Sequence, residues 1–188
     1  MVRYSIYYKA TNVKGENVNM HSKTKKIVGA AIFAALVYIA TSVIIIPSPL
    51  KGYLNLGDCV VLLAGWMLAP GYGFLAAGLG SALADLFAGY VTYAPATFII
   101  KGAMAIVAFA CYKLMGNKLG KLPAQIIGAV LAELLMVTGY LVFEGFLYGF
   151  VPSLVNVPAN AVQGAAGIVI GILLIKVFEK AKISELFK

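Results

Sequence analysis

The sequence predicts an all-α integral membrane protein, a bundle of six transmembrane helices with the N- and C-termini in the cytoplasm. The first observation is the composition: 62% of the 188 residues are hydrophobic and only 12% are charged, whereas soluble domains average roughly 45–50% and about 25%. The second is a series of apolar runs, and the third is the position of the lysines. Because lipid offers the backbone no water, such runs must form helices or closed barrels, and no alternating strands of about ten residues occur here.

The apolar runs give the predicted spans in chain order. The first run has twenty residues without a charged side chain, enough for a helix that crosses about 30 Å of hydrocarbon. The six predicted spans are 27–46, 59–69, 72–89, 95–115, 122–149 and 158–178. The second span is short. An alternative joins it to the third across Pro70 and Gly71 as one broken helix, which gives five spans.

The distribution of basic residues decides between these alternatives. Of the fifteen Lys and Arg residues, six precede the first span, three lie at or between the facing ends of the fourth and fifth spans, and four lie at or after the end of the sixth. With six spans these groups share one side of the membrane, and only Lys51 and Lys101 lie elsewhere. Cytoplasmic loops are enriched in Lys and Arg, so the pattern favours six spans with cytoplasmic ends. The net charge of +8 thus reflects orientation in the membrane, and we expect no nucleic-acid partner.

The predicted membrane domain covers residues 25–182 as a single unit. Residues 1–24 are polar and show no helical period, so we expect a flexible N-terminal tail. The first span is longer than the 7–15 residues of a signal-peptide core, and Ile-Pro-Ser-Pro follows it without a small-residue cleavage site. We therefore expect the first span to be retained as an uncleaved helix.

Several function classes are excluded by residues that the chain lacks. The P-loop pattern G-x-x-x-x-G-K-[ST] is absent, so the chain does not bind ATP in that way. The only histidine, His21, lies outside every span. A serine nucleophile would lack its usual base, and a zinc or copper ion would lack imidazole ligands. We expect no enzyme activity, no metal site and no cofactor in this chain.

Polar residues inside three of the predicted spans recur at helical spacing. The stripes are Thr97, Lys101 and Met104 on span four, Glu133, Val137, Tyr140 and Glu144 on span five, and Asn156, Asn160, Gln163 and Gly167 on span six. Residues three and four apart share a helix face, and ionisable residues within a membrane usually mark a function. Packed together, the stripes would enclose a polar pocket that opens to the outer side.

The alternative is that these side chains only hold the helices together, for example through an ion pair of Lys101 with Glu133 or Glu144. The first loop, 47–57, combines turn-forming with apolar residues, which is typical of a loop that packs over something. Either it forms a lid on the pocket with Tyr53 and Asn55 facing inward, or it packs on the helix ends. Asp85, followed by Tyr90 and Tyr93, either caps the next loop or touches a ligand.

The first span carries two overlapping Ala-x-x-x-Ala patterns, formed by Ala30, Ala31, Ala34 and Ala35. Small residues four apart form a flat stripe on which another helix packs closely. The stripe serves either the bundle itself or the docking of a separate subunit.

The stretch 56–73, Leu-Gly-Asp-Cys-Val-Val-Leu-Leu-Ala-Gly-Trp-Met-Leu-Ala-Pro-Gly-Tyr-Gly, resembles the second-helix region of the S components of energy-coupling factor (ECF) transporters. Gly-Ser-Ala-Leu-Ala-Asp at 80–85, Gly-Tyr at 89–90 and Tyr-Ala-Pro-Ala-Thr-Phe-Ile-Ile-Lys-Gly at 93–102 continue the resemblance. It extends over about residues 25–180, and its specific part lies between residues 55 and 102.

The resemblance implies a high-affinity substrate-binding subunit of an ECF-type ABC importer. S components bind one water-soluble vitamin or vitamin precursor from outside, near loop one and the last three helices, and topple in the membrane to deliver it. They dock on a transmembrane T subunit through an Ala-x-x-x-Ala stripe on helix one, matched here by Ala30/Ala34 or Ala31/Ala35. Two ATPase subunits bound to the T subunit use the ATP. The implied location is the bacterial cell membrane, as a multi-pass protein.

The sequence resembles most the branch linked to hydroxymethylpyrimidine or pyridoxine-type rings, followed by pantothenate. Two carboxylates with amides and aromatic residues suit an amino- or hydroxyl-bearing heteroaromatic ring, whereas an unpaired Lys101 would suit the carboxylate of pantothenate. The predicted substrate-binding residues are Tyr53, Asn55, Thr97, Lys101, Glu133, Tyr140, Glu144, Asn156, Asn160 and Gln163. The alternatives are a structural subunit of a membrane complex without a ligand, and a stand-alone secondary carrier, whose paired repeats with broken helices are not seen here.

Overall fold

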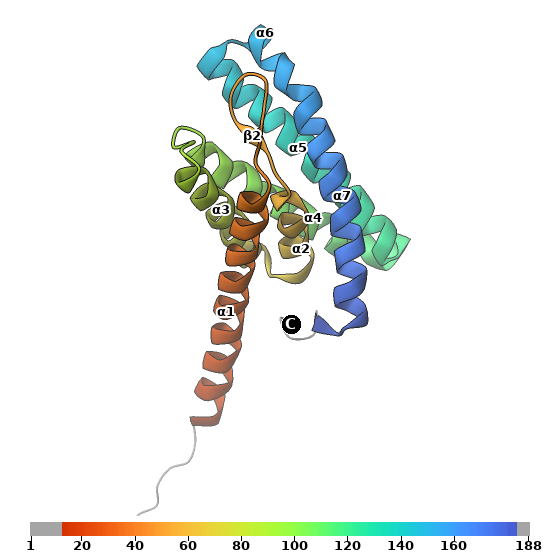
Figure 1. Ribbon diagram of the computed structural model, residues 1–188. Helices are drawn as coiled ribbons and strands as arrows, with labels where there is room; N and C mark the ends of the chain where they lie inside the picture. Colours follow the sequence, from red (N-terminus) through yellow and green to blue (C-terminus); the bar gives the residue numbers. More distant parts are fainter. Residues whose placement is uncertain (1–12, 184–188) are drawn as a thin grey trace, which may run out of the picture.

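The computed structural model describes residues 13–183, with side chains from Lys23 onwards, and these residues are helical except for loops and two strands of two residues each (Figure 1). In chain order the elements are α1 (Val13–Val43), β1 (Ile46–Pro47), β2 (Tyr53–Leu54), α2 (Gly57–Met67), α3 (Pro70–Phe87), α4 (Ala94–Leu119), α5 (Lys121–Tyr148), α6 (Phe150–Ser153), the 3₁₀ turn η1 (Leu154–Asn156) and α7 (Val157–Lys180). The all-helical prediction is confirmed, and each predicted span overlaps one of the six helices of 11 or more residues among the described residues.

Helices α2 and α3 are separate and fold back on each other. The backbone is extended at Leu68 (ψ 159°) and at Ala69 (ψ 151°), and Pro70 begins α3, where its missing amide hydrogen costs no helical bond. A methyl group on Gly73 would lie 3.2 Å from the carbonyl oxygen of Ala64. A continuous helix rises about 1.5 Å per residue and would keep these positions far apart, so the alternative of one broken helix is wrong.

Four helical stretches among the described residues are long and apolar enough to cross a membrane: Lys23–Val43, Ala94–Leu119, Lys121–Tyr148 and Phe150–Lys180. Helix α2, with 11 residues, is about 16 Å long, roughly half of the hydrocarbon thickness. Helix α3 contains four glycines and Asp85 within its 18 residues. The count of six full spans and the cytoplasmic side of both ends stay predictions.

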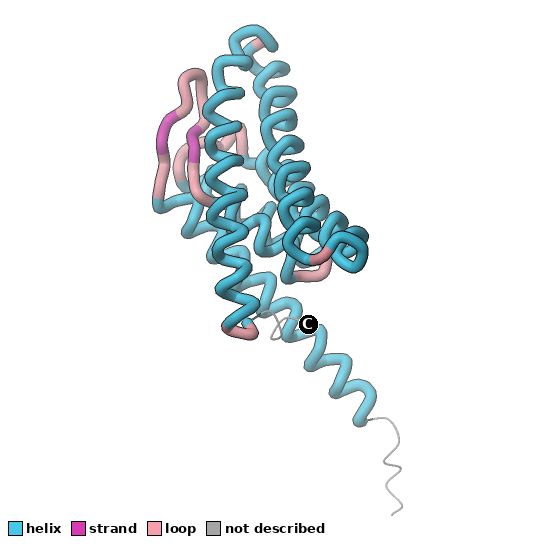
Figure 2. Tube along the Cα trace, turned by 90° about the vertical axis from the view of Figure 1, so that its right-hand side faces the viewer, coloured by secondary structure: helices cyan, strands magenta, loops and turns pink. Residues whose placement is uncertain are grey.

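The N-terminal boundary of α1 differs from the sequence prediction. We expected a flexible tail over residues 1–24, but α1 begins at Val13, so residues 13–24 are helical; residues 1–12 lie outside the described part. The physical reason is that a helix already nucleated by its membrane-spanning part propagates with one hydrogen bond per added residue. Polar residues can therefore extend it without an amphipathic pattern of their own. In Figures 1 and 2 this part of α1 extends beyond the other helices.

Helix α2 forms the centre of the bundle, and all 11 of its residues are buried. Around it pack the fully buried side chains of Phe33 and Val37 from α1, Met104 from α4 and Met136 from α5. Small residues allow these close approaches: a methyl group on Gly65 of α2 would lie 2.6 Å from a backbone oxygen of α4. The short α2 therefore acts as a packed core element surrounded by longer helices.

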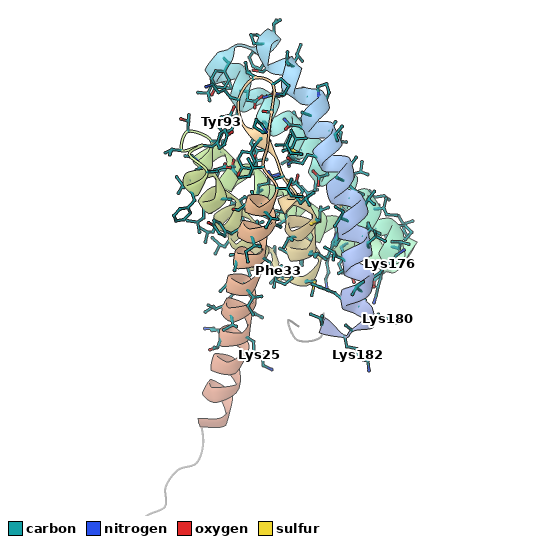
Figure 3. All side chains as sticks on the ribbon, viewed as in Figure 1. Lys25, Phe33, Tyr93, Lys176, Lys180 and Lys182 are labelled. Atoms are coloured by element: carbon teal, nitrogen blue, oxygen red, sulfur yellow. The ribbon has the colours of Figure 1, made fainter. Side chains whose placement is uncertain are left out.

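The two strands form a small antiparallel hairpin in which Ile46 pairs with Leu54 and Pro47 with Tyr53. Figure 2 shows the hairpin beside the helices, toward the end of the bundle where α7 begins. In Figure 3, Tyr93 lies toward this same end, whereas Lys25, Lys176 and Lys180 lie at the opposite end. The bundle thus has a hairpin end and a lysine-bearing end, as the distribution of basic residues predicts.

Candidate ligand-binding site

A pocket lies under the hairpin, where the ends of α3, α4, α5 and α7 meet. Its lining consists of Ser48, Lys51, Gly52, Tyr53, Asn55, Asp85, Tyr90, Tyr93, Thr97, Tyr140, Glu144, Asn160 and Gln163. The pocket has about 380 Å³ of empty space up to its open mouth, but only about 30 Å³ of this can hold water, which is room for one or two molecules. The structure therefore shows the pocket nearly closed.

Side-chain amides from η1 and α7 hold the hairpin in this closed position. The backbone N–H of Leu50 donates to Asn156 Oδ1 (3.1 Å), and Asn156 Nδ2 donates to the carbonyl of Lys51 (3.0 Å). Further along, the backbone N–H of Asn55 donates to Gln163 Oε1 (2.9 Å). Each bond joins a main-chain group of the loop to a side-chain amide on η1 or α7. Asn156 therefore holds the tip of the loop, and Gln163 holds its end.

Two carboxylates of the pocket are only half satisfied. The hydroxyl of Tyr53 donates to Asp85 Oδ1 (2.7 Å), and Glu144 Oε1 accepts from Tyr93 (3.2 Å) and from Asn156 Nδ2 (2.9 Å). The second oxygens, Asp85 Oδ2 and Glu144 Oε2, are buried and make no hydrogen bond within the described residues. Buried polar atoms are nearly always paired, so these oxygens are suited to accept hydrogen bonds from a bound molecule.

Aromatic side chains line the pocket beside these carboxylates. The Tyr53 and Tyr90 rings lie 4.8 Å apart, and the Tyr90 and Tyr93 rings 6.2 Å apart at 89°. The hydroxyls of Thr97 and Tyr140 lie 3.0 Å from each other. Burial, and then the neighbouring Asp85 carboxylate, raise the pKa of the Tyr53 phenol, so this hydroxyl keeps its proton and remains a donor. The pocket offers flat apolar faces and acceptor oxygens together.

A second polar cluster lies outside the pocket lining, in the core next to α2. Lys101 forms a buried ion pair with Asp58 Oδ1, and Gln163 Nε2 donates to Asp58 Oδ2 (2.6 Å). Gln163 therefore connects this cluster to the hairpin. Glu133 lies nearby, because Asp58 and Glu133 both approach Gly167 of α7. A methyl group on Gly167 would lie 2.8 Å from Asp58 Cβ and 3.0 Å from Glu133 Oε1.

Comparison with known proteins identifies the family. A family model described as the S component of ECF-type riboflavin transporters matches residues 21–180. The chain belongs to this family of ECF S components. A solved structure described as the S component of a bacterial ECF transporter shares the fold, with a TM-score of 0.69 over 84% of this chain and 97% of that one, at 24% sequence identity. An uncharacterised protein of Pyrococcus woesei is 35% identical over 136 residues, which are 72% of this chain and 88% of the relative.

The family confirms the resemblance to ECF S components; the branch expected from the sequence, for hydroxymethylpyrimidine or pyridoxine-type rings or pantothenate, stays a prediction. S components are the substrate-binding membrane subunits of ECF vitamin transporters, and they work with a T component and ATPases as transport subunits, not as enzymes. The S component described here is therefore a multi-pass membrane protein of the transport class.

The pocket of the S component gathers seven of the ten substrate-binding residues expected from the sequence. These are Tyr53, Asn55, Thr97, Tyr140, Glu144, Asn160 and Gln163. The other three, Lys101, Glu133 and Asn156, are buried but lie outside the lining. The expected pair of Lys101 with Glu133 or Glu144 is wrong, because Lys101 pairs with Asp58 of α2. Asp58 lies on α2, outside the polar stripes of spans four to six.

The S component also uses pocket residues that the helical stripes did not include. These are Ser48, Lys51, Gly52, Asp85, Tyr90 and Tyr93. The sequence did single out Asp85, Tyr90 and Tyr93, with capping and ligand contact as alternatives, and the structure brings all three to the pocket. The signal was a carboxylate near the end of a span, followed by two tyrosines in the next turn.

The two Ala-x-x-x-Ala patterns of the S component face different surroundings. Ala30 and Ala34 are half-buried against the core, and the Ala34 carbonyl lies 2.5 Å from where a methyl group on Gly80 of α3 would be. Ala31 and Ala35 are exposed. One pattern therefore packs the bundle and the other is exposed on α1, although Ala31 also lines the apolar groove between α1 and α3 that Ala30 and Ala34 line.

Proposed function

We propose that this S component captures one water-soluble heteroaromatic vitamin from outside the cell and passes it to a T subunit driven by two ATPases. Riboflavin is the first candidate, because the matching family model carries that description. A hydroxymethylpyrimidine or pyridoxine-type ring is the second candidate, and pantothenate the third. In this proposal the hairpin end faces outward, since the lysines lie at the other end and basic residues favour the cytoplasm.

The observation that carries the proposal is the pair of buried oxygens, Asp85 Oδ2 and Glu144 Oε2, beside a tyrosine-lined wall. Leaving a buried acceptor unpaired costs about 1–3 kcal/mol, and a ligand that donates to both oxygens recovers this cost. Riboflavin carries a flat ring for the tyrosine faces and N–H and hydroxyl donors for the carboxylates. Hydroxymethylpyrimidine and pyridoxine offer the same combination on a smaller ring.

Pantothenate suits this pocket less well. Its carboxylate would meet the like charges of Asp85 and Glu144, which line the pocket. The cation that would have favoured it, Lys101, is already paired with Asp58 outside the lining. Two carboxylates against one lysine, Lys51, remain in the lining, and like charges disfavour binding, so the pocket favours neutral or cationic rings.

The hairpin is the lid in this proposal. The cavity of about 30 Å³ is smaller than a vitamin ring, so in this proposal the hairpin moves away before a vitamin enters. This movement breaks the hydrogen bonds from the loop to Asn156 and Gln163, and re-forming them after entry closes the vitamin in. Ala31 and Ala35, on the exposed face of α1, are the residues that we propose for docking on the T subunit.

Mass spectrometry of small molecules released from the purified S component tests this proposal. The vitamin found is then titrated into vitamin-free protein, together with riboflavin, hydroxymethylpyrimidine, pyridoxine and pantothenate, using wild type and Asn160→Ala. Asn160 lines the pocket, so its loss should weaken binding by roughly fivefold, the equivalent of one hydrogen bond. Recovery of no vitamin and failure to bind any of the four, in protein shown to be folded, would instead favour a structural subunit without a ligand.

A further inference from the structure

A second cavity, larger than the vitamin pocket, lies at the lysine-bearing end of the described residues. It measures about 310 Å³ and is bounded by α1, α2, α4, α5 and α7. Its origin is the length of α2: this helix ends at Met67 after 11 residues, whereas α4, α5 and α7 have 24 to 28. The longer helices continue beyond α2, so the interior of the bundle lacks a helix at this end.

The charged residues around this inner cavity make it basic. Lys26 of α1, Lys113 of α4 and Lys121 of α5 line it, against one acidic residue, Glu179 of α7. The cavity also lies at the N-terminus of α5, which begins at Lys121 without a side-chain cap. The free N–H groups and the dipole at a helix N-terminus favour an anion. Three lysines and a helix N-terminus thus outweigh one carboxylate.

Two buried donors in the lining have no partner. Trp66 Nε1 and Gln125 Nε2 make no hydrogen bond within the described residues, although the two side chains are only 7% and 2% exposed. Both belong to the inner cavity. A buried N–H without an acceptor costs about 1–3 kcal/mol, so these groups are suited to donate to an acceptor placed in this space.

The remaining lining and the surrounding surface are apolar. Phe109 and Tyr112 of α4 line the cavity next to the lysines. On the neighbouring turns, Leu114, Leu119 and Val177 are 72%, 51% and 59% exposed, which is expected of side chains that face acyl chains. A soluble anion would contact only the basic part of this region, whereas a lipid would cover both parts.

We propose that the inner cavity binds an anionic phospholipid of the cytoplasmic leaflet. The phosphate lies among Lys26, Lys113 and Lys121 and accepts hydrogen bonds from Trp66 and Gln125, while the acyl chains lie along α4 and α7. Basic pockets between helices on the cytoplasmic side are suited to anionic headgroups. The lipid takes the place of the missing inner half of α2 and stabilises the bundle around it.

The test uses Trp66, the only tryptophan of the chain, as a reporter within the cavity. The full-length protein, delipidated in a neutral detergent, is titrated with short-chain phosphatidylglycerol, phosphatidylcholine or inorganic phosphate while Trp66 fluorescence is followed. We expect a saturable change with phosphatidylglycerol only. The double variant Lys113→Gln/Lys121→Gln should bind phosphatidylglycerol roughly 25-fold more weakly, at about fivefold per lysine. The matched control, Lys118→Gln with Lys180→Gln, removes two lysines from the same end outside the lining and should leave this binding unchanged.

Equal responses to phosphatidylglycerol and phosphatidylcholine would overturn the proposal, because they would show apolar binding without recognition of charge. A response to inorganic phosphate of the same strength would also overturn it, in favour of a soluble phosphate ligand. If the Lys113/Lys121 variant binds phosphatidylglycerol normally but no longer joins the T subunit, the cavity belongs to the partner subunit. Gln125→Leu, which removes a buried donor but no charge, gives a second variant, with an expected loss of about fivefold.

Discussion

Replacing Asn156 with alanine separates the role of a lid fastener from that of a ligand contact. Asn156 makes two hydrogen bonds to the loop, one from Leu50 N–H and one to the Lys51 carbonyl, and lies outside the pocket lining. Its third hydrogen bond, to Glu144 Oε1, does not involve the loop and does not enter the estimate for the closed hairpin. At about 1 kcal/mol for each net hydrogen bond, Asn156→Ala destabilises the closed hairpin by about 2 kcal/mol. This corresponds to roughly a 30-fold change in the opening equilibrium.

The same two bonds are present in the closed state whether the pocket is empty or loaded. Opening therefore becomes easier in both cases, and the association and dissociation rates of the vitamin should both rise about 30-fold, while Kd changes by less than about threefold. Stopped-flow fluorescence with the vitamin identified by mass spectrometry measures both rates. Asn160→Ala is the matched control, since Asn160 lines the pocket. There we expect faster dissociation, unchanged association and a weaker Kd.

An Asn156→Ala variant that dissociates faster without associating faster would refute this reasoning. That result would make Asn156 a ligand contact, as the polar stripe of predicted span six first suggested. Unchanged rates in both directions would show that the amide bonds do not hold the hairpin, and that its packing on the helix ends closes the pocket.

Three further predictions concern the bundle and its partner. Lys101→Met should destabilise the detergent-solubilised protein by about 3–5 kcal/mol, because it leaves the Asp58 carboxylate buried without its ion-pair partner. The double variant Lys101→Met/Asp58→Leu should recover most of the thermal stability. Failure of this recovery would argue against the ion pair. Gly65→Val should lower Tm by several degrees, because even its Cβ would lie 2.6 Å from a backbone oxygen of α4; an unchanged Tm would contradict the close packing. Ala31→Leu should keep vitamin binding but lose co-purification with the T subunit. Ala30→Leu, on the half-buried side of α1, should instead lower Tm. Equal behaviour of the two variants would refute the proposal that Ala31 docks on the T subunit while Ala30 packs the bundle.

Much of this architecture follows from hydrophobicity alone. Long apolar runs predict helices because the bilayer allows few other structures, and the break at Pro70 was visible in the sequence. The polar stripes on α5 and α7 were also predictive, because residues such as Glu144 and Asn160 keep their helical face when the helices pack. Side chains that share a stripe near one end of a helix therefore reached one pocket.

The failures arise where contacts depend on tertiary packing. The partner of Lys101 is Asp58, 43 residues away in the chain, and helical spacing gives no information on which helix lies opposite. Asn156 has the right spacing for the pocket, but its amide is used by the loop. The inner cavity arises from the different lengths of neighbouring helices, and it became apparent only when the end of α2 was seen among its neighbours.

The most direct test of the central claim is a fluorescence titration of riboflavin into the vitamin-free S component, with Glu144→Gln and Glu133→Gln as a matched pair. Both glutamates lie on α5, but only Glu144 lines the pocket. We expect saturable one-to-one binding that Glu144→Gln weakens roughly fivefold, because an acceptor loses its charge, and that Glu133→Gln leaves unchanged. Folded protein that binds neither riboflavin nor any of the other three vitamins, or an affinity that depends on Glu133 and not on Glu144, would contradict it.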